Sequence, residues 1–373
     1  MSKRANVILS VLFLAFIGLF FLMNLVIPDK EMSEQENRYL QTLPTFSAEN
    51  LFSGKYMKEF ESYCSDQFPL RDGWIRLKAR MELLQGKGAN NGIYLCEQER
   101  LLEPFISPGA SELSRRAAAV REMAANTDIP VTLGLIPGAE DIYSDLLPEG
   151  VKNDSEAAAI QTVYEAASVN TVNIYDTLRE QSESDIYYRT DHHWTSLGAY
   201  WGSVAVLEAL GLPASPPEAY TPETVSDSFC GTAYSSSGFF WVTPDRMQRF
   251  APAPDSLTVT KYQGETEIPV SLYDESALNT KDKYRFFLGG NTPRVVLRNA
   301  DSDGQKLLII RDSYSDSLVP FLTDSFSEIH LLDLRYYRAS LSEYIEQNAI
   351  DQALILYSVK NFCTDTNLAL LTR

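Results

Sequence analysis

The chain has 373 residues, of which 45% are hydrophobic and 22% charged, a composition typical of a folded protein with a large core. Fifty acidic side chains against 32 basic ones give a net charge of −18 at neutral pH. Because an acidic surface repels polyanions, the composition argues against a nucleic-acid ligand and disfavours other polyanionic partners.

The first distinctive segment is an apolar run near the N-terminus, from Val7 to Ile27. It carries no charge and is long enough to cross the roughly 30 Å hydrocarbon core of a bilayer as a helix. Lys3 and Arg4 precede it, which predicts that the N-terminus stays inside and the rest of the chain lies outside. No A-x-A-like cleavage site follows the run. The sequence therefore predicts an uncleaved anchor over residues 1–27, and a single-pass protein of the cell membrane whose domain is extracellular.

Behind the anchor, we predict a polar stalk over residues 28–48 and one large domain over 49–373. Apolar residues among charges predict helices between Asn50 and Gln85, with a break at Pro69. At about residues 213–300, a proline-rich stretch and alternating segments predict a β-rich insertion that lines a cleft.

From residue 111 onward, and outside the insertion, strand and helix patterns alternate. Such alternation predicts a mainly parallel sheet with right-handed crossovers. The predicted helices cover 111–126 (capped by Ser111), 155–168, 317–322 and 341–347. The predicted strands cover 131–136, 172–175, 306–311, 328–334 and 353–357, with 257–260 and 267–270 in the insertion.

Two of the three histidines stand together in a D-H-H-W tetrad that begins at Asp191. In an extended segment, residues two apart share a side, so we expect Asp191 and His193 to face one way and His192 the other. A carboxylate beside an imidazole fixes its tautomer and stabilises the imidazolium, as a general base requires. Thr195 or Ser196 is expected to cap the helix that follows.

Two histidines and a carboxylate are also a known set of metal ligands. However, adjacent histidines on a strand rarely converge on one ion, and the chain offers only one further histidine. That residue, His330, lies in an apolar stretch and suits a core strand better than a site. We therefore predict no metal and no other cofactor.

A second segment with chemical character, Asp312 to Ser315, directly follows the apolar run Leu307–Ile310. Ser313 at the end of such a strand, before a turn into a helix, has a usual position for a nucleophile in an open α/β sheet. Aspartate and serine also suit a helix N-terminus, so a helix cap is the other interpretation. The Asp-x-His pair favours the nucleophile, because a serine needs an oriented base to activate it.

Further segments accompany the tetrad and the serine, namely Glu36 to Arg38, Asp66 to Arg71, Phe287 to Asn291, Pro320 to Leu322 and Asp333 to Tyr337. With them, nearly the whole chain resembles the DHHW family of Gram-positive-type bacterial proteins. That family is similar to the alginate O-acetylation proteins of the AlgX/AlgJ type.

The resemblance implies an SGNH-hydrolase-like domain, a three-layer α/β/α sandwich in which an Asp-x-His pair precedes the serine. Asp191, His193 and Ser313 match that order, so the resemblance assigns them as the catalytic residues. Serine nucleophiles of SGNH enzymes follow a Gly-Asp pair, whereas here Arg311 replaces the glycine.

An oxyanion hole needs backbone N–H groups or an amide aimed at the developing charge, and Gly290 with Asn291 is the best candidate. A plain glycine turn is the other interpretation of that loop. Arg335 suits an anion or a substrate, or a salt bridge to a nearby acid. His192 and Tyr314 complete the candidate substrate-binding residues.

The resemblance further implies an O-acyltransferase, most simply one that O-acetylates a cell-surface or secreted polysaccharide. Its partners are then a glycan acceptor and an acyl donor, with acyl groups supplied across the membrane by an MBOAT-type acyltransferase. Two alternatives stay open: an acetyl esterase with the same catalytic residues, and a non-catalytic glycan-binding or envelope scaffold protein.

The four cysteines are scattered without C-x-x-C spacing, which argues against a zinc ribbon. An extracellular location permits disulfides. We favour a pair between Cys64 and Cys96, and free buried thiols at these positions and at Cys230 and Cys363 are the alternative.

Overall fold

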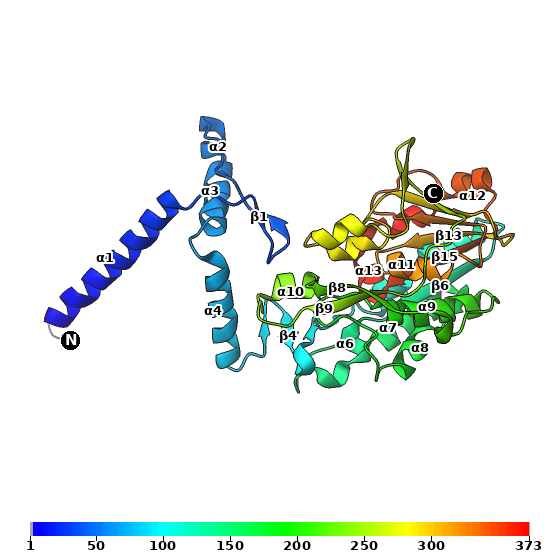
Figure 1. Ribbon diagram of the computed structural model, residues 1–373, viewed down its shortest axis with the longest axis horizontal. Coiled ribbons are helices and arrows are strands. Elements are labelled where there is room, and N and C mark those ends of the chain that lie inside the picture. The colour runs from blue at the N-terminus through cyan, green and yellow to red at the C-terminus, as the bar shows by residue number, and fades with distance from the viewer. Residues whose placement is uncertain (1–2, 373) are drawn as a thin grey trace. The chain divides into compact units, whose positions relative to one another are not determined.

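The computed structural model describes residues 3–372, and the chain forms two compact units (Figure 1). The smaller unit comprises Met1–Asn91 and Tyr234–Trp241. The larger unit comprises Gly92–Ala233 and Val242–Arg373, and it contains the α/β core.

Helices make up most of the smaller unit: α1 Lys3–Val26, α2 Ala48–Phe52, α3 Lys55–Asp66 and α4 Arg71–Leu84. Among the described residues, α1 is the one helix long and apolar enough to cross a membrane, and none of its residues is buried. It fits either a membrane span or a signal anchor. The predicted helix break at Pro69 is confirmed, because α3 ends before it and α4 begins after it.

Ion pairs join the predicted stalk to α3 and α4. The Arg38 guanidinium bonds both carboxylate oxygens of Asp66, and Arg71 pairs with Glu36. Asp66 also accepts the backbone N–H of Gln41 at 2.9 Å. The hydrogen bond from Arg38 is the main reason why the pKa of Asp66 is lowered. These contacts join the segments Glu36 to Arg38 and Asp66 to Arg71 to each other.

The larger unit is built on an eight-stranded sheet in the order β11-β10-β12-β14-β13-β15-β6-β7. The strands from β14 to β7 run parallel, and β12, β10 and β11 continue the sheet antiparallel. The predicted mixed α/β fold with a large, mainly parallel sheet is confirmed. The strand bounds are β6 Val131–Ile136, β7 Asn170–Val172, β10 Leu257–Gln263, β11 Thr266–Val270, β12 Arg294–Asn299, β13 Lys306–Arg311, β14 Glu328–Leu332 and β15 Gln352–Ser358.

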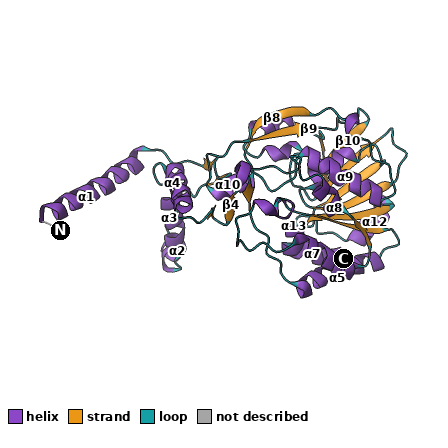
Figure 2. Cartoon of the chain, turned by 90° about the horizontal axis from the view of Figure 1, so that it is seen from below, coloured by secondary structure: helices purple, strands orange, loops and turns teal. Residues whose placement is uncertain are grey.

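Helices cover both faces of this sheet (Figure 2). Alternate residues of the central strand β13 point to opposite faces of the sheet and enter two separate cores. Leu307 and Ile309 belong to the first core, and Leu308 and Ile310 belong to the second. The first core is covered by α8 Ile174–Glu180, α9 Ser196–Ala209 and α11 Ser315–Leu318. The second is covered by α5 Ala110–Ala125, α7 Glu156–Ala167, α12 Leu341–Asn348 and α13 Val359–Thr364.

Several predicted boundaries are wrong for local reasons. Gly109, whose φ of +91° suits glycine, begins α5, so Ser111 lies inside the helix instead of capping it. The predicted strand 172–175 ends early, because the Asn173 side chain caps α8. The predicted helix 317–322 is the short α11, continued by a 3-10 turn.

The predicted β-rich insertion exists, but most of it joins the main sheet. Strands β10, β11 and β12 extend the sheet beyond β14, whereas β8 Glu223–Phe229 and β9 Asp245–Arg249 pair only with each other. Without β12, β14 would be an edge strand with unpaired backbone N–H and C=O groups. Pairing with β12 satisfies these groups.

The four cysteines are free thiols in the described chain, so the favoured Cys64–Cys96 disulfide is not formed. Cys64 is exposed, and Cys363 is buried in the second core. Burial raises the pKa of the Cys363 thiol to about 12, which makes it unreactive.

Two buried carboxylates, Glu140 and Glu156, lie next to the segment that follows β6. Glu156 is fully buried, and one of its oxygens accepts the Gly138 N–H at 2.5 Å. Glu140 is nearly buried and approaches the same glycine. Burial raises the pKa of Glu140 to about 7 and that of Glu156 well above its ordinary value, and the nearby charge of Glu140 raises the pKa of Glu156 further.

The raised pKa values of Glu140 and Glu156 predict that the contribution of these residues to the free energy of unfolding falls as the pH rises. A raised pKa means that the folded state holds protons that the unfolded state has already released, so stability is lost from about pH 4.5 upward. We expect Glu156→Gln to gain stability relative to wild type by on the order of 1 kcal/mol when the pH goes from 5 to 8. Denaturant unfolding at both pH values measures this, with the exposed Glu149→Gln as the control. A difference between Glu156→Gln and wild type that does not change with pH would contradict the account.

Candidate active site

Asp191, His193 and Ser313 form a continuous chain of hydrogen bonds. His193 Nδ1 lies 2.5 Å from Asp191 Oδ1, and His193 Nε2 lies 2.8 Å from Ser313 Oγ. Because a carboxylate can only accept, Nδ1 carries the proton and Nε2 accepts from the serine hydroxyl. Asp191 and His193 are buried and Ser313 is half-buried. The three residues lie in the order in which an acid orients a base and the base activates a nucleophile.

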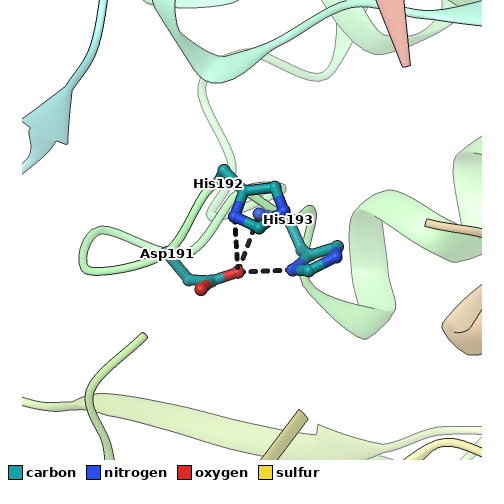
Figure 3. Close-up of side chains that lie close together, drawn as sticks. All are labelled: Asp191, His192 and His193. Atoms are coloured by element: carbon teal, nitrogen blue, oxygen red, sulfur yellow. Dashed lines mark hydrogen bonds and ion pairs between the residues drawn. The ribbon is translucent and has the colours of Figure 1, made fainter. Parts of the chain in front are cut away.

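The tetrad is a turn, not an extended segment, and this corrects the expected direction of His192 (Figure 3). The Asp191 side chain accepts the backbone N–H of His193 at 2.9 Å, which closes the turn. The two imidazole rings therefore lie beside each other, with centroids 3.9 Å apart. His192 Nδ1 lies 2.6 Å from Thr232 Oγ1, and its side chain is 46% exposed. His192 thus borders the site from the solvent side.

Asp191 is fixed by a loop of the insertion that sequence reasoning missed. Its Oδ2 accepts the backbone N–H of Thr232 at 2.7 Å and the hydroxyl at 3.0 Å. Gly231 leaves the room for this contact, since a Cβ there would lie 2.1 Å from Asp191 Oδ2. Burial alone would raise the pKa of Asp191, but the adjacent imidazoles and these hydrogen bonds hold it well below its usual range. Asp191 therefore stays a carboxylate that orients His193.

The serine turn is anchored by Asp312. One carboxylate oxygen accepts the Tyr314 N–H at 3.0 Å. The other accepts three hydrogen bonds of 2.8 Å, from the N–H and hydroxyl of Ser358 and from the Asn361 amide. Since β13 lies between β14 and β15, these bonds tie the turn to the end of a neighbouring strand. The Ser313 side chain caps no helix and points to His193, so the cap interpretation does not hold.

Tyr284 is a further site residue without a signal in the sequence. Its ring stacks on the His193 imidazole, with centroids 3.7 Å apart and planes 11° apart. Its hydroxyl lies 3.0 Å from Ser317 Oγ, which holds the ring in place. The stacked ring excludes water from one face of the imidazole and restricts its rotation.

Arg311, at the position where the family resemblance leads us to expect a glycine, points away from solvent. It is fully buried and forms a 2.8 Å ion pair with Asp316. Burial raises the pKa of Asp316 to about 6, although the guanidinium opposes this shift. Both side chains of the pair are buried, so the arginine in place of the glycine lies inside the domain.

The candidate oxyanion loop is placed next to Arg335. The Arg335 guanidinium lies 3.4 Å from Asn291 Oδ1 and binds the Asp333 carboxylate at 2.7 and 2.9 Å. Gly290, with a φ of +89°, forms the turn before Asn291. Among residues 3–372, neither Gly290 nor Asn291 hydrogen-bonds to Ser313, and the Ser313 N–H has no acceptor there. The loop remains a predicted oxyanion donor, and the Ser313 N–H is a second candidate.

The Tyr314 side chain is buried between the two motifs and does not line an open part of the site. Its hydroxyl donates to the His192 carbonyl. The Trp194 indole donates to the Tyr314 carbonyl at 3.0 Å. These contacts join the tetrad to the serine turn, so Tyr314 is not exposed to a substrate.

The tetrad also brings three potential metal ligands together. One ligand atom each from Asp191, His192 and His193 lies within 4.8 Å of the others. However, both Asp191 oxygens accept hydrogen bonds, and His193 Nδ1 carries a proton toward one of them. A metal ion would have to replace these bonds, so the residues fit a hydrogen-bonded relay better than a metal site.

The family comparison agrees with the motif analysis. A family described as "DHHW protein" matches residues 111–332, which is more than half of the chain. The chain belongs to the DHHW protein family. The match includes the DHHW tetrad and the serine turn. No curated protein matches this DHHW chain in a sequence search.

Solved structures with TM-scores above 0.6 share the fold of this DHHW protein. A DHHW family protein from Eubacterium siraeum DSM 15702 is 26% identical with a TM-score of 0.66, over 75% of this chain and 95% of that one. PatB1 from Bacillus cereus, with a sulfonyl adduct, is 20% identical with a TM-score of 0.63, over 75% and 98%. The O-acetyltransferase domain of Pseudomonas putida AlgJ is a weaker match, 15% identical with a TM-score of 0.46, over 75% and 98%.

Proposed function

We propose that this DHHW protein is a membrane-anchored, extracytoplasmic O-acyltransferase that O-acetylates a cell-surface or secreted polysaccharide. The observation that carries the proposal is the relay from Asp191 through His193 to Ser313, with contacts of 2.5 and 2.8 Å. Such a relay activates a serine toward acyl groups. The acetyl group, the glycan acceptor and an MBOAT-type supplier of acyl groups come from the family resemblance.

The reaction has two halves. In the first, Ser313 Oγ attacks the carbonyl carbon of the acyl donor while its proton passes to His193 Nε2, and that proton then goes to the leaving group. In the second, a sugar hydroxyl gives its proton to His193 and attacks the acyl-enzyme, so that Ser313 leaves and regains the proton. Asp191 keeps the imidazole oriented and stabilises its charged form in both halves.

The proposal is tested with a small acetyl ester as donor. We expect wild-type protein to carry an acetyl group on the Ser313 peptide by mass spectrometry, and Ser313→Ala to carry none. The exposed Ser342→Ala is the control and should behave as wild type. Acetyl found on an added glycan supports the transferase, whereas acetate release alone supports an esterase. If a broad panel of esters produces neither adduct nor turnover, a scaffold role replaces the enzymatic one.

The location gives a separate prediction. The charge-free run in α1 and the preceding Lys3 and Arg4 support a location of the catalytic unit outside the cell. Protease added to intact protoplasts should digest that unit, while a cytoplasmic marker protein stays intact. Full protection until the protoplasts are lysed would refute the extracellular orientation.

A further inference from the structure

One face of α4 carries a row of large apolar side chains that remain exposed. The row begins with Leu70, directly before the helix, and continues with Trp74, Leu77, Met81 and Leu84. Because the spacing alternates between four and three residues, these side chains form one continuous stripe along the helix. Their exposed fractions range from 38% to 80%. A contiguous apolar surface of this kind marks an interaction site.

The stripe is not the face by which α4 packs inside the smaller unit. That packing uses Ile75 and Ala79, of which Ala79 is fully buried. Both lie against Gly238, where a Cβ would come within 2.9 Å of the Ile75 side chain. The helix therefore has two apolar faces, one covered by its own unit and one open to another partner.

Basic side chains border the stripe on both sides. At about 100° per residue, Lys78 lies beside one edge of the stripe and Arg80 beside the other. Among residues 3–372, neither forms an ion pair, since Lys78 Nζ contacts the Asn91 amide oxygen at 3.1 Å and the Arg80 guanidinium lies over the Trp241 ring. Both partners are neutral, so the two positive charges stay uncompensated. A basic amphipathic helix of this kind is typical of a membrane surface, even though the whole chain is acidic.

The start of the stripe contacts the helix that we propose as the membrane anchor. The Phe68 ring stacks on Phe20 of α1, with centroids 5.3 Å apart and planes 9° apart. The Trp74 ring also lies 5.7 Å from Phe20. Phe20 lies six residues before α1 ends at Val26, which is about 9 Å along a helix. Interfacial helices bury their apolar face to a similar depth, roughly 5–10 Å.

A partner helix explains the stripe less well than lipid does. Alternating steps of four and three residues also occur in coiled coils, but a coiled coil sustains them over about three to four heptads. The helix α4 has only 14 residues. Lipid accounts for the flanking charges as well, because long basic side chains reach the headgroups while their stems cover apolar surface.

We propose that the stripe from Leu70 to Leu84 lies in the outer leaflet of the membrane beside α1, with Lys78 and Arg80 at anionic lipid headgroups. The inference goes beyond acyl transfer and rests only on the membrane anchor of the proposed function. The larger unit begins at Gly92, shortly after α4 ends. The contact would therefore keep the first residues of that unit near the membrane, where the acyl groups are proposed to arrive.

The experiment uses the full-length protein in vesicles of phosphatidylcholine and phosphatidylglycerol in equal parts. A photo-crosslinking amino acid replaces Leu77 or Met81 in the stripe, or Arg76 as the control, an exposed residue on another face of the same helix. By mass spectrometry, we expect about 5-fold more lipid adducts at Leu77 and Met81 than at Arg76. Lys78→Gln with Arg80→Gln should reduce the adducts at Met81 about 5-fold, because each charge contributes to binding an anionic surface. Circular dichroism checks that every variant is folded.

Crosslinks from Leu77 and Met81 to a second copy, or to the larger unit of the same chain, would overturn the proposal because protein would then cover the stripe. Equal lipid adducts at Arg76 would overturn it too, and adducts unchanged by the double glutamine variant would refute the headgroup contact. Flotation of the vesicles tests the anchor separately. Protein that floats without lipid adducts at the stripe would leave α1 as the anchor and remove α4 from the membrane, whereas protein that does not float would refute the anchor itself.

Discussion

Ser313→Ala and His193→Ala are each expected to reduce acyl transfer by about 10⁴-fold or more, and the double variant should be little worse than either. The reason is that the 2.8 Å contact between Ser313 Oγ and His193 Nε2 makes the two side chains one unit. Without His193, the serine has no base to take its proton. Without Ser313, the imidazole has no nucleophile to activate. Asp191→Asn should cost a similar factor, because an amide in place of the carboxylate favours the wrong imidazole tautomer.

Rates with an acetyl ester and a glycan acceptor, compared in a double-mutant cycle, measure this coupling. Ser342→Ala is the matched control for a lost hydroxyl, and circular dichroism checks that each variant is folded. Independent, multiplying losses in the double variant would show that the two residues do not act together. Wild-type rates in a folded His193→Ala protein would remove the histidine from the mechanism.

The sequence was sufficient to predict which side chains meet at the candidate site, because Asp191, His193 and Ser313 lie in two compact motifs. The Asp-x-His spacing and the serine after an apolar strand point to these residues without any knowledge of distant contacts, and the family resemblance assigns them a catalytic role. The direction of His192 was wrong because the period of two holds only for an extended backbone, and the tetrad turns. A hydrogen bond from a side chain to its own backbone competes with the strand, and the residue pattern does not reveal the outcome.

The residues that hold Asp191 and His193 in place were not predictable because they come from the insertion. Gly231, Thr232 and Tyr284 lie far from the tetrad in sequence, in segments with no regular apolar period. Their roles depend on contacts formed only after folding, such as the stacking of Tyr284 on His193. Parallel strands are easier to predict, since a buried strand such as Val131–Ile136 is an almost continuous apolar run.

Gly231→Ala is expected to slow acyl transfer by about 10²-fold while the protein stays folded, because small displacements in a catalytic relay have effects of this size. The added Cβ would lie 2.1 Å from Asp191 Oδ2 and 2.2 Å from Asp191 Cβ, so the aspartate or the loop must move. Either movement breaks the bonds from Thr232 that hold the carboxylate in place. His193 then loses its orienting partner although no catalytic residue has been changed.

If Gly231 acts by positioning Asp191, further results beyond a slower reaction are expected. If Gly231 acts through Asp191, adding Gly231→Ala to Asp191→Ala should cost little further activity. The proton NMR signal of the imidazole N–H that bonds to Asp191 should also shift or disappear in Gly231→Ala. Gly73→Ala is the matched control, because a Cβ at Gly73 has open space around it. A folded Gly231→Ala protein with wild-type rates and an unchanged imidazole signal would show that the loop relaxes at no cost, and that Asp191 is held by its other contacts alone.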